Sequence, residues 1–565
     1  MIQFNLSKKQ IVLIFLFLAI FIIGSIFIFI TPFTVKSTYG LTVTTGDGVH
    51  ISFDVFEPRQ GGNNKKAVII GHGVMGNKEL MKGYAIELAA AGFVAIPFDF
   101  RGHGQSTGDR SSGSLIDDIR AVKNYLMNER TDIDINNLGY IGLSMGGAGQ
   151  QLIDIDLDFK CFIGTATWLY NDLRRGNSTN PLNVLLIQGI FDELLDISNL
   201  KEAVANRTDL PLQDVNVNKL YGSFENGNAT KLYLDDNSNH FFSYFDTDFI
   251  REAKNWVINT FPDVIQTDEN FYAHIRLIIL IIQIIGGLGL FIMITGPLTS
   301  LFLKRKEEER TIQKISLPDV SIKSISVKIL IYSLVFAIPG ILIMVLINFP
   351  LGLALLGFLI SLIFGQAFGQ FILIWRLGKR NDISLLDILK KPFSDSKPSL
   401  LLQTCLGVSL AAILFVILYF SIGLNYFGIV PSITKSLWVP IYMLITFFTY
   451  IIYGLVHQFA LQAKFEKTNR SLCKIIILNF SFMFIYMFIY VLILSFAIRS
   501  FFYFGFLVPI SIPVFLLTSL TWSFLYRKTG NIITGAIVTT VYFVMLISTA
   551  ASLENMLSFI FGFLS

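Results

Sequence analysis

Cysteine is scarce in this sequence, with only Cys161, Cys405 and Cys473 along 565 residues. Only Cys161 lies in a stretch of mixed polarity, so that stretch cannot close an internal disulfide, and a small disulfide-stapled fold is excluded. No histidine and cysteine stand at the spacing of zinc ligands. We therefore expect no metal site.

Charged residues are also few. They make up 15% of the chain, against roughly 25% in soluble proteins, and 53% of residues are hydrophobic. The mean hydropathy is +0.61. The net charge of +4 comes mostly from short loops between apolar runs, so the sequence predicts no nucleic-acid partner.

Long apolar runs divide the chain. Residues 11–30 carry no charge, and about 20 such residues span a bilayer. This run is longer than the roughly 7–15-residue core of a signal peptide, and no small-residue cleavage site follows, so we expect an uncleaved anchor. The sequence predicts four parts: a cytoplasmic N-terminus (1–10), a transmembrane anchor (11–30), a polar domain (31–270) and a membrane domain of about eight transmembrane helices (271–565).

The apolar runs also predict which loops lie on each side of the membrane. We expect spans near 11–30, 274–296, 325–347, 351–374, 401–423, 437–460, 475–497, 504–525 and 532–552. With alternating spans, the loops on one side hold 20 lysine and arginine residues, and the short loops on the other side, apart from the polar domain, hold only Lys435 and Arg499. Because cytoplasmic loops are enriched in these residues, we expect a multi-pass cell-membrane protein whose polar domain faces outside. His457 and Gln458 fall near a cytoplasmic helix end, where an interfacial role is favoured and a functional site is the alternative.

The polar domain alternates strands with helices. Strands are predicted over 48–58, 66–73, 93–100, 138–144, 161–167, 183–189 and 231–236, and helices over 78–91 and 115–129. This pattern favours a mostly parallel sheet covered on both faces. In such sheets the chemistry gathers at the carboxyl ends of the strands, where Asp99, Ser144, Asp192 and His240 all fall.

One motif has a second interpretation. GHGVMG (71–76) follows a strand and opens a helix, and Asp99 stands about 20 residues further on, as in a dinucleotide-binding site. That interpretation leaves GLSMGG (142–147), Asp192 and His240 without a role, and nicotinamide cofactors are scarce outside cells. We therefore expect no cofactor.

GLSMGG instead predicts a serine nucleophile on a tight turn between strand and helix, where neighbouring glycines avoid clashes. A serine needs a base and the base needs an orienting acid. His240 follows the last strand, and Asp192 follows the strand before it, with Glu193 and Asp196 as rivals for the acid. The backbone N–H groups of Met145 and Val74 are expected to form the oxyanion hole.

Five segments together resemble a known family: GHGVMGNKE (71–79), DFRGHGQS (99–106), GLSMGG (142–147), GIFDE (189–193) and NHFF (239–242). The polar domain resembles the α/β-hydrolase superfamily, close to its serine aminopeptidase S33 and monoacylglycerol-lipase-like branch. The resemblance implies that Ser144 is the nucleophile, Asp192 the acid and His240 the base. It also implies that Asp99 and Arg101 shape the loop beneath the site.

The helical cap of many relatives is missing. Only about 15 residues separate the strands at 161–167 and 183–189, so the lid is expected to be short or to come from elsewhere, with 206–229 and the membrane face as candidates. We expect a membrane-embedded, extracytoplasmic serine hydrolase that contacts lipid and cleaves an ester or amide of a small-molecule, lipid or peptide substrate. The alternative is a transporter or scaffold whose hydrolase-like domain only binds.

Overall fold

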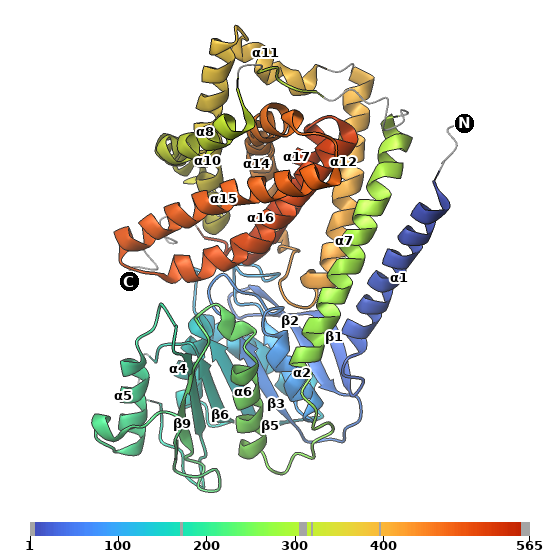
Figure 1. Cartoon of the computed structure of the whole chain (residues 1–565). Helices are drawn as coiled ribbons and strands as arrows, with labels where there is room; N and C mark the ends of the chain where they lie inside the picture. The colour runs from blue at the N-terminus through green and yellow to red at the C-terminus, as the bar shows by residue number, and fades with distance from the viewer. Residues whose placement is uncertain (1–5, 170–172, 304–312, 318–319, 395–396, 555–565) are drawn as a thin grey trace.

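The computed structural model describes residues 6–169, 173–303, 313–317, 320–394 and 397–554. Part of the predicted N-terminal segment (1–5) and the end of the predicted membrane domain (555–565) lie outside these residues. A sheet domain lies beneath a group of long helices (Figure 1). Helix α1 (Lys8–Ile30) runs down to the first strand, so the beginning of α1 and the sheet domain lie at opposite ends of this helix.

The sheet has nine strands in the order β1-β2-β4-β3-β5-β6-β7-β9-β8. Their bounds are β1 Val35–Thr44, β2 His50–Pro58, β3 Lys65–Gly71, β4 Val94–Phe98, β5 Ile133–Leu143, β6 Phe159–Thr165, β7 Asn183–Gly189, β8 Leu220–Tyr221 and β9 Thr230–Asp235. The six strands from β4 to β9 in this order pair in parallel, and β1, β2 and β8 pair antiparallel at the edges. The predicted mostly parallel sheet is confirmed, and strand β1 is one that the sequence pattern did not reveal.

Two buried clusters cover the two faces of the sheet, because successive side chains of a strand point to opposite sides. In β3, Val68 and Ile70 pack with helices α2 (Lys82–Ala90) and α6 (Thr247–Thr260). Ala67 and Ile69 pack on the other face, with α3 (Leu115–Glu129), α4 (Gln150–Ile155) and α5 (Ile197–Thr208). The core therefore fixes the register of the strands and with it the positions of their carboxyl ends.

The helical part contains eight helices long and apolar enough to cross a membrane, or nine if a bent pair counts as one span, among the described residues. The eight are α1, α7 (Ala273–Leu303), α10 (Ala354–Arg380), α12 (Lys397–Leu418, with its extension to Gly423), α14 (Val439–Gly454, with its extension to Lys464), α15 (Asn469–Ile498), α16 (Phe502–Thr529) and α17 (Ile533–Ala550). All nine predicted spans coincide with these helices or with the bent pair.

The bent pair replaces the single span predicted over 325–347. Helices α8 (Ile322–Val335) and α9 (Ala337–Asn348) meet at an angle of 51°. Pro339 explains the break, because it has no N–H for the carbonyl of Val335 and its ring clashes with that carbonyl.

The carboxyl edge of the sheet meets the helices directly. The backbone N–H of Ser432 donates to the carbonyl of Gly104 at 3.1 Å, and Leu553 bonds to Gly102 and Arg110 at 2.8 and 3.1 Å. These contacts join loops after β4 to segments on the sheet side of the helices. The edge where the sequence predicts the chemistry is therefore covered by the helical part of the same chain.

Candidate active site

Ser144 stands on a strained turn at the end of β5. Its φ is +50°, a left-handed conformation that few side chains adopt. Close packing holds the turn: a Cβ on Gly146 would lie 2.6 Å from the carbonyl oxygen of Gly71, and a Cβ on Gly73 would lie 3.0 Å from the Cβ of Ser144. The hydroxyl of Thr167 donates to the Ser144 carbonyl at 2.7 Å. The turn thus presents the Ser144 hydroxyl at the sheet edge, as a nucleophile turn requires.

The structure brings the side chains of Ser144, His240 and Asp192 into one chain of hydrogen bonds, which we call the Ser144 relay. The Nε2 atom of His240 lies 3.0 Å from the Oγ of Ser144, and Nδ1 lies 2.9 and 3.1 Å from the two carboxylate oxygens of Asp192. An ionised carboxylate only accepts, so Nδ1 carries the proton and Nε2 offers its lone pair to the Ser144 hydroxyl. This arrangement can move the hydroxyl proton to His240 as the oxygen attacks a substrate.

Burial and backbone contacts hold the relay in place. Ser144 is 7% exposed, and the side chains of His240 and Asp192 are buried. The Oδ1 atom of Asp192 accepts from the backbone N–H groups of Leu194 and Leu195, both at 3.0 Å. These two bonds fix the carboxylate before it meets the imidazole.

The rival acids occupy other positions. Asp196 caps α5 by accepting from the N–H of Ser198 at 2.9 Å. Glu193 does not reach the imidazole ring; its Oε2 accepts from the backbone N–H of His240 at 3.3 Å, and its buried Oε1 has no hydrogen-bond partner among the described residues. Burial raises the pKa of the Glu193 carboxyl against the lowering effect of the nearby backbone N–H groups and His240.

The predicted oxyanion donors lie on the two segments that meet at Ser144. Val74 follows Gly73, which packs against the Ser144 side chain, and Met145 follows Ser144 itself. Tyr244, a residue that the sequence analysis missed, positions the first segment: its buried hydroxyl accepts from the N–H of Gly73 at 2.9 Å. The only sequence signal for it is its place four residues after His240.

The dinucleotide interpretation fails because Asp99 is already paired. Its carboxylate accepts from the backbone N–H of Lys78 at 2.7 Å, from Lys78 Nζ at 3.0 Å and from the N–H of Gln105 at 2.9 Å. Asp99 is fully buried, so no ribose can reach it. Lys78 lowers the pKa of the Asp99 carboxyl despite the opposing effect of burial.

The other strand-end residues support the loops. His72 is buried, contacts the Gly73 carbonyl through Nδ1 at 2.7 Å and accepts from the N–H of Phe100 at 3.1 Å. Burial lowers its pKa to about 4, so it is neutral at pH 7. Arg101 pairs with Asp118 at 2.8 Å and with Asp47 at 2.8 Å. His72, Asp99 and Arg101 therefore hold the loops beneath Ser144, as the resemblance implies for the last two.

One carboxylate group among the described residues has the spacing to hold a cation: Asp235, Asp246 and Asp248, with ligand atoms within 4.8 Å of one another. Two of these carboxylates already serve the backbone. Asp235 accepts from two N–H groups in the following turn, and Asp246 caps α6. These hydrogen bonds explain why the carboxylates lie close together, because Asp235 stabilises a turn and Asp246 caps a helix.

The helical part lies over the relay. The ring of Phe241, next to His240, packs edge-on against Phe506 of α16 with centroids 5.3 Å apart. Gly505 of the same helix packs directly on the Glu193 carboxylate, so a larger residue there would displace the end of the Glu193 side chain. Of the two candidate lids, the membrane face is the one that covers these residues.

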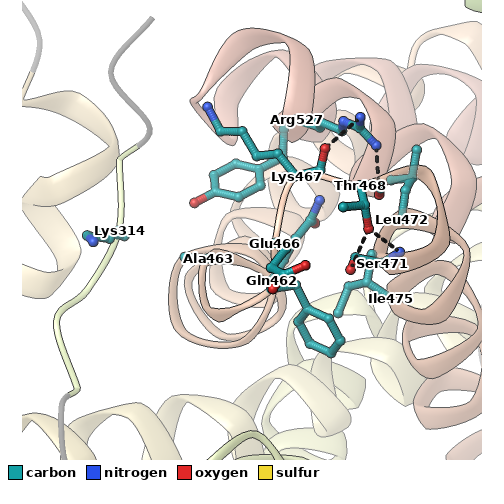
Figure 2. Close-up of a pocket in the computed structure, with 12 residues that line it drawn as sticks. Lys314, Gln462, Ala463, Glu466, Lys467, Thr468, Ser471, Leu472, Ile475 and Arg527 are labelled. Carbon is teal, nitrogen blue, oxygen red and sulfur yellow. Dashed lines mark hydrogen bonds between the residues drawn. The ribbon is translucent and has the colours of Figure 1, made fainter.

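A separate hollow of about 320 Å³ lies among the helices (Figure 2). It is lined by residues of the loop between α14 and α15, including Gln462, Glu466 and Lys467, together with Arg527. Arg527 donates to the carbonyls of Thr468 and Lys467, both at 3.1 Å. None of its lining residues belongs to the Ser144 relay.

His457 is not interfacial. It is fully buried, its Nδ1 lies 2.8 Å from the Oδ1 of Asn479, and the rings of Phe482 and Trp522 pack around it. The expected interfacial position is therefore wrong for His457. Gln458 is also buried. Helix packing places this segment in the interior.

Comparisons with known proteins agree with the sheet topology. Residues 62–206 match the profile of the family described as serine aminopeptidase, S33. An uncharacterised protein of Mycobacterium tuberculosis is 31% identical over 108 residues, which cover 19% of this chain and 38% of that protein. The uncharacterised protein YfhR of Salmonella typhimurium is 26% identical over 190 residues, covering 27% and 64%. This chain thus spans well under half of the length of the mycobacterial relative.

Two solved structures are also similar to this chain. The Pyrococcus furiosus esterase Pf2001 is 17% identical with a TM-score of 0.32, covering 42% of this chain and 96% of the esterase. The Xanthomonas campestris protein XC6422, described as an α/β serine hydrolase without a lid, is 21% identical with a TM-score of 0.30, covering 40% and 94%. The sheet domain therefore has an α/β-hydrolase fold and is similar over residues 62–206 to the serine aminopeptidase S33 family, and it is joined to a set of apolar helices compatible with a multi-pass membrane protein.

Proposed function

We propose that this protein is a membrane-embedded serine hydrolase that cleaves an ester or amide bond through an acyl-enzyme on Ser144. The observation that carries the proposal is the relay itself. Ser144, His240 and Asp192 come from three separate loops, yet their side chains meet at 3.0 and 2.9 Å with the polarity that a nucleophile and its base require.

In the first half of the reaction, His240 Nε2 takes the Ser144 proton while Oγ bonds to the substrate carbonyl carbon. Asp192 stabilises the imidazolium that forms, and the N–H groups of Val74 and Met145 stabilise the oxyanion. The intermediate collapses when the C–O or C–N bond breaks, and His240 gives its proton to the leaving alcohol or amine. The acyl group then stays on Ser144.

In the second half, a water molecule gives a proton to His240 and its oxygen bonds to the acyl carbon. The bond to Ser144 breaks, and His240 returns the proton to Oγ. The products are a carboxylic acid and the free enzyme, so the relay is restored without any metal or cofactor.

We also propose that the hydrolase domain, residues 31–270, faces outside the cell and that residues 271–565 form the membrane domain. Two observations support this placement. The beginning of α1 and the sheet domain lie at opposite ends of that helix, and the loops predicted on the side where α1 begins carry nearly all of the loop lysine and arginine residues.

One experiment tests enzyme and sidedness together. Intact cells expressing the full chain are treated with a membrane-impermeant fluorophosphonate, and the wild type is compared with Ser144→Ala. Labelling of the wild type alone is the expected result. Ser144-dependent labelling only after lysis would reverse the sidedness and keep the enzyme. Absence of labelling in both preparations would contradict the hydrolase and favour a binding module attached to a transporter or scaffold.

A further inference from the structure

The interior of the helical part is polar around His457. His457, Asn479 and Ser523 come from the extension of α14, from α15 and from α16, and all three side chains are fully buried. Asn479 joins the other two: its Oδ1 lies 2.8 Å from Nδ1 of His457, and its Nδ2 donates to the Oγ of Ser523 at 3.0 Å. We call these three residues the His457 cluster. Polar side chains are costly inside a membrane, and an ionisable one there marks a functional site by default.

Hydrogen bonding within the His457 cluster is incomplete. An amide oxygen only accepts, so Nδ1 of His457 carries the ring proton and Nε2 presents a lone pair. That Nε2 atom is buried and has no hydrogen-bond partner among the described residues. Polar side chains that only hold helices together pair with one another. A buried lone pair that faces no donor of the chain instead requires a donor from outside it, because an unpaired buried group is destabilising.

The backbone departs from the regular helix at the same place. Residues Leu455–Leu461 form a π-helix, and all seven are buried. Such wide turns occur mostly as short insertions in α-helices, and they are frequent at functional sites. The distortion therefore lies in the interior, at the residue that presents the unpaired lone pair.

The hollow of Figure 2 lies about one helical turn from the His457 cluster. It is lined by Gln462, Ile475 and Tyr526, one from each of the three helices that carry the cluster. Each stands three to five residues from the cluster member on its own helix, which is about one turn. Gln462 also bonds directly to the cluster, because its Nε2 donates to the backbone carbonyl of Ser523 at 2.7 Å. Gln462 thus stands between the hollow and the cluster.

The surroundings of His457 indicate what kind of molecule it can take. The rings of Tyr453, Phe482 and Trp522 lie around the imidazole, with centroids 5.6, 5.7 and 6.1 Å away. In the described part of the chain, the ring bonds to an amide and to no carboxylate or ammonium group. A buried ion would have no counter-charge there. An uncharged molecule with a hydrogen-bond donor and some apolar atoms matches both the lone pair and the rings.

We propose that the helical part holds a second binding site, at the His457 cluster, for a small uncharged molecule with a hydroxyl or amide N–H group that enters through the hollow. The donor of this molecule bonds to Nε2 of His457, and its apolar atoms pack on the surrounding rings. Gln462 closes the floor of the hollow, so its side chain moves to admit the molecule. This site does not depend on the Ser144 relay, and it gives the helices a binding role beyond carrying the hydrolase domain.

The test measures access from the hollow to the His457 cluster in the full-length protein in nanodiscs. The background carries Cys405→Ser and Cys473→Ser, because both cysteines are exposed. Ser523→Cys is then treated with 2-hydroxyethyl methanethiosulfonate, an uncharged reagent with a hydroxyl group. We expect it to react at least tenfold faster than Ser333→Cys, the matched control, which is equally buried on α8 but does not line the hollow.

Two further variants locate the route. Ala463→Trp fills the hollow and should slow the reaction of Ser523→Cys at least fivefold, whereas Gln462→Ala should accelerate it. Cys473→Trp in place of Cys473→Ser is the control for ring size, because Cys473 does not line the hollow, and it should change the rate less than twofold. Equal rates for Ser523→Cys and Ser333→Cys, or no effect of Ala463→Trp, would overturn the inference.

A second measurement uses the unsubstituted protein. A polar site that takes a hydroxyl compound holds water when it is empty, and radiolysis of that water labels the side chains beside it. Normalised for intrinsic reactivity, Trp522 should be labelled at least fivefold faster than Phe291, an equally enclosed ring of α7. Equal normalised rates for the two rings would show a dry interior and contradict the inference.

Discussion

Replacement of Asp192 by asparagine should lower turnover by about four orders of magnitude and leave the fold intact. The side chain of Asp192 is almost fully buried and has two roles. Its Oδ1 accepts from the N–H groups of Leu194 and Leu195, and its Oδ2 lies 2.9 Å from His240 Nδ1. An asparagine with its oxygen at the Oδ1 position keeps both backbone bonds, so the loop should not move.

The same substitution replaces the hydrogen-bond acceptor that faces the imidazole with a donor. The amide nitrogen would stand where Oδ2 stands and would donate to Nδ1. The ring proton would then move to Nε2, which lies 3.0 Å from the Ser144 hydroxyl, and His240 could no longer take the serine proton. In a serine triad such a wrong tautomer costs about 10⁴ in kcat, equivalent to about 5 kcal/mol of barrier.

The assay is ester turnover by the full-length protein in detergent, together with the rate of Ser144 labelling by a fluorophosphonate. Two matched variants complete the comparison. Asp196→Asn removes the charge of the α5 cap and should retain wild-type turnover, and Glu193→Gln should lose less than about tenfold, because an amide oxygen can still accept from the His240 N–H. Turnover of Asp192→Asn within tenfold of wild type, or an equal loss in Glu193→Gln, would refute the assignment of the acid.

Three further predictions concern the loops around the relay. Gly73→Ala should lower ester turnover about 100-fold, because the new Cβ would lie 3.0 Å from the Cβ of Ser144 and would displace the segment that carries the Val74 N–H. Gly46→Ala is the control: open space surrounds Gly46, so ester turnover should not change. Tyr244→Phe should reduce the free energy of unfolding by about 1–3 kcal/mol in denaturant titrations, because it leaves the buried Gly73 N–H without an acceptor; equal stability would contradict this. The pKa of His72 is about 4 in the folded state against an ordinary 6.5, so the unfolded state binds more protons between these values and stability falls as pH falls. Between pH 7 and pH 5 the opening free energy of the β3 loop, measured by hydrogen exchange, should drop by about 2 kcal/mol, and His72→Gln should abolish that part of the drop.

The sequence by itself determined the fold class of the hydrolase domain and the positions of its reactive residues along the chain. Buried strands, helices and glycine turns are local patterns, and in a parallel sheet the carboxyl ends of the strands must share one edge. Ser144, Asp192 and His240 each follow a strand, so the topology alone brings them to that edge. The apolar runs likewise located the long helices, because spanning length and hydropathy depend on composition and little else.

Local patterns could not decide details set by side-chain direction and distant contacts. Asp192 and Glu193 are neighbours in one loop, and only the backbone bonds to Leu194 and Leu195 turn the first towards His240. Strand β1 lies at the edge of the sheet, and it is recognised as a strand through its pairing with β2, which a local sequence pattern does not record. The bend at Pro339 depends on how two helix segments pack, and proline alone permits either a kink or a break.

Only the tertiary structure decided which segments lie over Ser144, Asp192 and His240. Gly505 and Phe506 lie more than 260 residues beyond His240 in the sequence, and nothing local connects them to Asp192 or Ser144. They meet because the whole helical part docks on the carboxyl edge of the sheet, through contacts such as Ser432 with Gly104. Burial of His457 has the same origin, since neighbouring helices enclose it. A sequence pattern records which face of an element is apolar, but the element that covers this face is chosen by packing over the entire chain.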